Sequence, residues 1–358
     1  MRAISKRLYP ALVCVIMAGG GAQAMTLTDG FELADSQSFA ADSIFDAVVQ
    51  LDLGGASCSG TLIAPTAVLT ARHCTDIVSG PGDITVNFRD KDPVSVTATR
   101  VATAIDDLAG TNPGTNPNND LDTFSYFDGS DIAILTIPEV LDIDPFSLLD
   151  GDVGVELVTM VGYGRTGDLG GADSGTGIET RTLAQNVTFI DMIDELIFAD
   201  FDDAENSVAR GLEDGDDNLI AVDAVAVDEA GDVILDMGMP VDFLPVLLDA
   251  DGNPIRDDAG DLVSTEGMIA PGDSGSALFV ERNGQLLIAG VATGGFSMMD
   301  PPASEEGTIG VWTSTNTAEA REKIIAARGT YVAPIPLPLS AVLLAGGLGL
   351  LPLLRRRS

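Results

Sequence analysis

The chain has 358 residues, of which 45% are hydrophobic, and a formal net charge of −37 at pH 7. This length is enough for a sizeable core in one large or two ordinary domains. Six of the 18 Lys and Arg lie at the two ends, so the body between them carries a net charge of about −43. Such acidity disfavours binding to nucleic acid or to an anionic membrane surface, and its simplest interpretation is solvation and solubility.

The N-terminus, residues 1–24, predicts a secretory signal peptide. Basic residues open it, an apolar stretch over 8–19 is too short to span a bilayer, and Ala22-Gln23-Ala24 is a small-x-small cleavage site. We therefore expect export through the Sec pathway, to the cell envelope, the surface or the medium. Residues 25–44 are polar and acidic, without Lys or Arg, and are expected to be a leader or a propeptide.

From residue 45 onwards, short runs rich in Val, Ile, Leu and Thr favour β-strands. Strands are expected over 47–53, 61–64, 67–70, 84–88, 94–101, 132–137, 157–161, 182–190, 219–227, 233–235, 276–280, 286–293 and 308–313. Helical spacing of apolar residues predicts one helix over 317–328, with Gly329 as its stop. Residues 190–265 carry many carboxylates and are treated as an acidic insertion. The fold class is therefore expected to be all-β.

Two cysteines remain after signal removal, because Cys14 lies inside the predicted signal peptide. Cys58 and Cys74 then form the only pair, and in an exported protein a pair is most simply one disulfide. Closing that loop contributes on the order of 3 kcal/mol in the chain-entropy model.

The only histidine, His73, is followed by Asp131 and Ser274, in the chain order of one catalytic triad family. A serine becomes a nucleophile when a base takes its proton, and it must lie on a tight turn whose N–H groups face the developing oxyanion. Gly272 and Gly275 permit such a turn around Ser274. We predict that Ser274 attacks, His73 acts as the base and Asp131 orients it. The Gly-Asp-Ser-Gly motif alone is equally compatible with an ordinary hairpin turn.

Several motifs in the same order resemble the trypsin/chymotrypsin-like serine proteases. They are 58–63, 70–74, 131–135 and 272–275, with further markers at 162–164, 290–295 and 310–313. The resemblance implies a trypsin-like double six-stranded β-barrel with a C-terminal helix over residues 45–330, and a site in the cleft between the barrels. It also implies an oxyanion hole made by the backbone N–H groups of Gly272 and Ser274, and a protein or peptide substrate.

The chain departs from that family at Arg72 and at Ser276, which replaces the second glycine after the nucleophile, and both departures are expected to be tolerated; a larger departure concerns activation. Arg72 stands where the family usually has alanine. No Lys or Arg occurs between Met25 and Ala71, so a trypsin-like activation cut is not evident and the partner of Asp273 is left open.

The resemblance also implies where substrate binds. Met268 falls at the floor of the specificity pocket, with walls near Thr293 and Gly295. Because no carboxylate lies at this floor, we predict a preference for apolar P1 residues.

The C-terminal segment 331–358 is proline-rich, then apolar over 339–354, and ends in three arginines and a serine. It resembles the PEP-CTERM group of bacterial sorting tails, with 335–339 similar to the variant built around Val-Pro-Leu-Pro-Ala. Such a tail would hold the protein at the membrane, arginines inside, until a sorting protease removes it. A plain membrane anchor is the alternative.

No cofactor or metal is expected, although a group of carboxylates could bind calcium: Asp249, Asp251, Asp257, Asp258 and Asp261. Their spacing does not match an EF-hand loop and favours solvated turns. We expect a monomer. The alternative function is a catalytically silent surface binding protein on a protease scaffold, with the acidic insertion as its binding element.

Overall fold

The computed structural model describes the following residues: 26–27, 33–41, 43–89, 96–108, 126, 129–139, 142–164, 167–168, 180–189, 195–201, 220–222, 225–227, 235–236, 239–240, 266–297 and 308–333. The predicted signal peptide, the candidate calcium carboxylates and the sorting motif lie outside the described residues. Among the helices that are described, none combines the length and the apolar character needed to cross a membrane.

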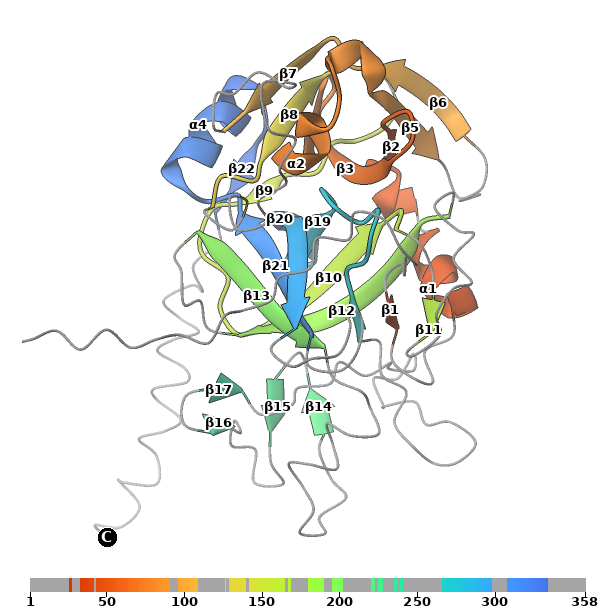
Figure 1. The fold of residues 1–358 in the computed structure, drawn as a ribbon. Helices are drawn as coiled ribbons and strands as arrows, with labels where there is room; N and C mark the ends of the chain where they lie inside the picture. Colours follow the sequence, from red (N-terminus) through yellow and green to blue (C-terminus); the bar gives the residue numbers. More distant parts are fainter. Residues whose placement is uncertain are drawn as a thin grey trace, which may run out of the picture.

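Seven antiparallel strands form the first barrel-like sheet, in the upper half of Figure 1. In sheet order they are β6 (Val96–Val101), β5 (Thr85–Arg89), β2 (Val48–Asp52), β3 (Ser57–Ala64), β4 (Ala67–Thr70), β8 (Ala133–Thr136) and β7 (Ala104–Asp107). Strands β2, β3 and β4 are buried along almost their whole length, and the polar residues Gln50, Ser59 and Thr61 within them are buried too.

Six strands close the second barrel, in the lower half of Figure 1. In sheet order they are β19 (Ala277–Arg282), β10 (Leu157–Gly162), β12 (Thr182–Phe189), β13 (Leu196–Phe201), β21 (Thr308–Ser314) and β20 (Gln285–Ser297). Because β20 also pairs with β19, the ring has no free edge. Two short strands extend this sheet in parallel: β9 (Leu148–Leu149) pairs with β20, and β22 (Tyr331–Val332) pairs with β9. The predicted all-β double barrel is confirmed.

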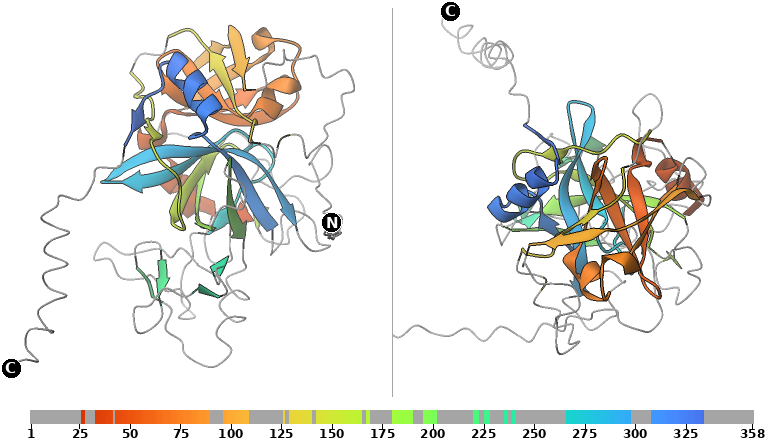
Figure 2. Two further views of the ribbon diagram at one scale, coloured as in Figure 1. Left: turned by 90° about the vertical axis from the view of Figure 1, so that its left-hand side faces the viewer. Right: turned by 90° about the horizontal axis from the view of Figure 1, so that it is seen from above.

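Helices are few in the described part of the chain, as expected for an all-β fold. They are α1 (Leu33–Ala40), α2 (Arg72–Asp76), α4 (Ala318–Ala326) and the 3-10 helices η1 (Ser43–Phe45) and η2 (Pro81–Asp83). The predicted C-terminal helix is α4, and the hydroxyl of Thr317 caps it by accepting a hydrogen bond from the Ala320 N–H at 3.2 Å. Its buried face packs on the first barrel, as Figure 2 shows.

The predicted strand over 219–227 is wrong in one respect, because it is a small hairpin. Its strands are β14 (Ile220–Val222) and β15 (Val225–Val227), and a second hairpin of the insertion pairs β16 (Leu235–Asp236) with β17 (Met239–Pro240). Both lie below the second barrel in Figure 1.

The predicted leader packs against the second barrel. The hydroxyl of Ser36, in α1, donates to the Leu183 carbonyl at 2.6 Å and accepts from the Leu183 N–H at 3.1 Å. The fully buried Arg181 donates to the Ala40 carbonyl at 2.6 Å. Strand β1 (Thr26–Leu27) pairs with β18 (Gly267–Met268) and with β11 (Gly167–Asp168). This segment is therefore held by buried hydrogen bonds and by strand pairing.

One apolar cluster extends from the first barrel across the junction into the second, and a separate cluster fills the second barrel. At their junction, the ring centroids of Phe146 and Phe279 lie 4.6 Å apart, and those of Phe45 and Phe279 lie 5.9 Å apart. These aromatic contacts fix the barrels against each other, so loops from both can form a common site.

Candidate active site

His73 and Asp131 meet because their strands are neighbours in the first barrel. Thr70 in β4 pairs with Ala133 in β8, so the residues just after Thr70 face those just before Ala133. The Asp131 carboxylate accepts from His73 Nδ1 at 2.8 Å and from the His73 backbone N–H at 2.9 Å. Since a carboxylate only accepts, Nδ1 carries the proton and Nε2 is left to act as a base.

The environment of this pair favours the charged imidazolium. Asp131 is fully buried, whereas the His73 side chain is 21% exposed. Burial by itself lowers the pKa of His73, but the charge and hydrogen bond of Asp131, with a smaller contribution from Asp76, outweigh it. The pKa of His73 is therefore raised above its ordinary value of 6.5.

The loop that carries Ser274 is fastened to strand β3 of the first barrel. The Ser59 N–H donates to the Ser274 carbonyl at 2.8 Å, and the Ser59 hydroxyl donates to the Gly272 carbonyl at 2.9 Å. The same hydroxyl accepts from the Tyr163 N–H at 2.9 Å. Ser59 is buried, so these bonds are shielded from water and hold the second barrel's loop against the first.

Gly275 brings this loop close to the His73 helix. Its φ of +83° lies in the left-handed region, which favours glycine. A Cβ atom here would lie 2.2 Å from the Thr70 hydroxyl and 2.4 Å from the Ser59 carbonyl oxygen. Only glycine allows such an approach, and Thr70 is three residues before His73. The structure therefore brings the Ser274 loop and the His73–Asp131 pair together at the junction of the barrels.

The predicted oxyanion donors lie in a tight turn of this loop. Gly272 has a φ of +103°, and a Cβ there would lie 3.0 Å from the Gly164 Cα. The turn is closed by hydrogen bonds from the Asp273 N–H to the Ala270 carbonyl at 2.8 Å and from the Ser276 N–H to the Asp273 carbonyl at 2.7 Å. The amides of Gly272 and Ser274 are thus fixed on either side of Asp273.

Asp273, whose partner the sequence left open, is fully buried and bound by backbone amides. Its carboxylate accepts from the Gly164 N–H at 2.8 Å and from the Ala270 N–H at 3.1 Å. A Cβ on Gly162 would lie 2.2 Å, and one on Gly164 2.3 Å, from a carboxylate oxygen of Asp273. This close approach explains why residues 162 and 164 are both glycine. Each carboxylate oxygen of Asp273 therefore accepts a backbone N–H, and these bonds hold the serine loop in place.

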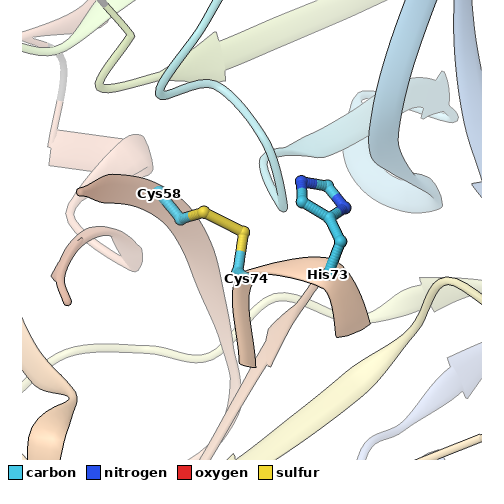
Figure 3. A group of neighbouring side chains, drawn as sticks. All are labelled: Cys58, His73 and Cys74. Carbon is cyan, nitrogen blue, oxygen red and sulfur yellow. A yellow bond between two sulfur atoms is a disulfide. The ribbon is translucent and has the colours of Figure 1, made fainter. Parts of the chain in front are cut away.

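The predicted disulfide is present. Cys58 and Cys74 are joined next to His73, as Figure 3 shows. Their sulfurs and the His73 ring would offer three metal-ligand atoms within 4.8 Å. Both sulfurs are in the disulfide, so no thiolate is available and these residues do not fit a metal site.

Of the predicted specificity residues, Thr293 and Gly295 lie on β20 of the second barrel, and Met268 lies on β18 and packs into the apolar cluster of that barrel. Met268 is buried, and its sulfur lies 2.6 Å from where a Cβ on Gly310 would be. Gly295 is the strand-pairing partner of Gly310. Met268 and Gly295 therefore both lie next to Gly310. The Thr293 hydroxyl is hydrogen-bonded to that of Thr313 at 2.8 Å.

Three residues around His73 were not predicted. The Tyr126 ring meets the His73 ring edge-on at 5.6 Å between centroids, and its hydroxyl donates to Asp76 at 3.1 Å. The Arg72 guanidinium lies 4.9 Å from the centre of the Tyr126 ring and 3.7 Å from the Asp76 carboxylate. The i, i+4 spacing of Arg72 and Asp76 was a visible signal for this ion pair.

Two comparisons with known proteins found similarities to this chain. The trypsin family model matches residues 36–211, just under half of the chain, which includes His73 and Asp131 but ends before Ser274. No curated protein matches the chain. A solved structure titled "Structure of Glu endopeptidase in complex with MPD" is 17% identical, covering 88% of this chain and 99% of that one, with a TM-score of 0.42. The chain has the trypsin-like double β-barrel fold, and the family match supports a trypsin-like serine protease.

Proposed function

We propose that this protein is an exported serine endopeptidase that cleaves peptide bonds through Ser274, His73 and Asp131. The observation that carries the proposal is the 2.8 Å hydrogen bond between His73 Nδ1 and the buried Asp131 carboxylate. A histidine bound in this way has one tautomer and one orientation, which is what a general base for serine needs.

The mechanism follows from these positions. The Ser274 hydroxyl attacks the scissile carbonyl while His73 Nε2 takes its proton, and Asp131 stabilises the imidazolium without taking the proton itself. The backbone N–H groups of Gly272 and Ser274 stabilise the negative oxygen of the tetrahedral intermediate. His73 then protonates the leaving amine, and an acyl-enzyme remains. Water, deprotonated by the same histidine, hydrolyses the acyl-enzyme and restores Ser274.

The proposed substrate has an apolar P1 residue. Met268 is an uncharged side chain at the proposed floor, and it belongs to an apolar cluster with Leu27 and Trp312. Such a floor offers no partner for a basic P1 residue, whose charge would be left desolvated. A strong preference for Arg or Lys in a panel of fluorogenic peptides would contradict this part of the proposal.

The proposal extends to the cellular setting. We propose that the signal peptide 1–24 directs export, that the protein is a monomer without a required cofactor, and that the segment 331–358 attaches it to the membrane until a sorting protease acts. The composition of both segments supports this, as argued from the sequence.

Labelling with a fluorophosphonate probe tests the proposal, because such probes react with serines activated by a base and an oxyanion hole. Wild type is expected to be labelled, and Ser274→Ala and His73→Ala are not. Circular dichroism of each variant controls for folding. An unlabelled, folded wild type would contradict the proposal and favour the binding protein on a protease scaffold.

A further inference from the structure

Arg72, where the trypsin-like proteases usually have alanine, is not part of the proposed triad, but it directly precedes the proposed base His73 and is only 8% exposed. Its guanidinium lies against the Tyr126 ring, and Tyr126 is itself only 5% exposed. A buried cation packed on an aromatic ring is well ordered, because leaving the site would cost both contacts. Arg72 and Tyr126 therefore form a fixed wall beside His73.

Asp76 contacts both Arg72 and Tyr126, and its negative charge also acts on the imidazole of His73. It accepts from the Tyr126 hydroxyl at 3.1 Å and lies 3.7 Å from the Arg72 guanidinium. Both partners favour its charged form, although burial is the larger effect and raises the pKa of Asp76. Its negative charge acts on His73 in the same direction as that of Asp131, whereas Arg72 acts in the opposite direction.

We propose that Arg72, Asp76 and Tyr126 form a positioning clamp beside His73, in which Tyr126 meets the imidazole ring edge-on and Arg72 and Asp76 hold Tyr126 in place. The proposal rests on the proposed role of His73 as the base. The clamp residues do not touch the reacting atoms. Tyr126 limits rotation of the ring by its edge-on contact, and Asp76 supplies a second negative charge for the imidazolium.

The charged and titratable groups around His73 come from three parts of the chain. Asp131 precedes β8, Arg72 and Asp76 lie on α2, and Tyr126 lies between β7 and β8 in the sequence. The buried carboxyl of Asp107, on β7, acts on Asp76 and makes it harder to ionise. Because Asp76 and Arg72 act on His73 with opposite signs, removing each charge must move the titration of His73 in opposite directions.

His73 is the only histidine in the chain, so its ring protons can be followed by NMR without an assignment problem. Asp76→Asn is expected to lower the titration midpoint, and Arg72→Met, which keeps the apolar stem of the side chain, is expected to raise it. Asp150→Asn and Arg321→Met remove a second Asp–Arg pair, 2.8 Å apart, that is not among the causes of the raised pKa of His73. These controls should leave the midpoint unchanged.

Kinetics supply the positioning readout. Tyr126→Leu removes the edge-on contact and is expected to lower kcat about tenfold with little change in KM, because a misplaced base slows the chemical step and not binding. The proposal is overturned if Asp76→Asn and Arg72→Met leave the midpoint unmoved or move it in the same direction. The titration needs no turnover, so this failure is distinct from an inactive Ser274, which the fluorophosphonate probe reports.

Discussion

Asp273→Asn is the substitution that most directly tests how the serine loop is held. The buried carboxylate accepts from two backbone N–H groups, those of Gly164 and Ala270, at 2.8 and 3.1 Å. An asparagine keeps one oxygen, but its amide group would face the second N–H donor. A hydrogen bond to a charged group contributes about 1.5–3 kcal/mol, and an unsatisfied buried donor costs about 1–3 kcal/mol.

The expected loss is therefore about 2–4 kcal/mol in the free energy of unfolding, measured in urea. The turn that fixes the amides of Gly272 and Ser274 should also loosen, so we expect kcat/KM on a small ester substrate to fall about 10²-fold. Asp52→Asn is the matched control, since its carboxylate accepts from one backbone N–H, of Gly54, at an exposed turn. Its effect should stay within about 0.5 kcal/mol. An Asp273→Asn variant as stable and as active as wild type would refute this reasoning.

Three further predictions concern stability and pH. Replacing Cys58 and Cys74 together by serine should cost about 3 kcal/mol in urea unfolding, and a reductant that leaves wild-type stability unchanged would argue against the disulfide. Ser36→Ala should lower the free energy of unfolding by about 1–3 kcal/mol, whereas a leader that does not pack would tolerate it. Because the pKa of His73 is raised, the acid limb of kcat/KM should have its midpoint above 6.5, and Asp131→Asn should lower that midpoint. By linkage, protonated His73 stabilises the fold fully below about 6.5, and this contribution is lost as pH rises through the folded pKa.

Much of the barrel framework could be predicted from local sequence. The apolar runs at 67–70, 132–137 and 157–161 correspond closely to β4, β8 and β10. This worked because a strand buried on both faces has a local signature in Val, Ile and Leu. The candidate active site could also be predicted, from the chain order of His73, Asp131 and Ser274. This worked because the chemistry of a catalytic triad allows few residue types at each position.

Other features depend on contacts between residues far apart in the sequence. The polar residues of α1 gave no periodic signal, and the helix is fixed by Ser36 and Leu183, which are 147 residues apart. The hydrogen bond from the Gly164 N–H to the Asp273 carboxylate likewise joins residues that are 109 positions apart. Tyr126 lies outside every strand and helix that the sequence predicts, so nothing local places its ring beside His73.

Helix α4 ends just before the glycine that the sequence predicts as its stop, but not because that glycine adopts the left-handed conformation. Gly329 was predicted as the stop of the helix, and the glycine N–H does donate to the Ile324 carbonyl at 2.8 Å. The left-handed residue, however, is Arg328, with a φ of +70°. Gly329 is needed because a Cβ there would lie 2.5 Å from the Ile324 side chain.

The central claim is that the His73–Asp131 pair and Ser274 together hydrolyse peptide bonds. The most direct test is to incubate a complex peptide mixture with the exported protein, in parallel with Ser274→Ala, and to identify new peptide termini by mass spectrometry. We predict new termini with wild type alone, with apolar residues on the amino side of the cleaved bonds. An absence of new termini with folded wild type, or the same termini with Ser274→Ala, would contradict the claim.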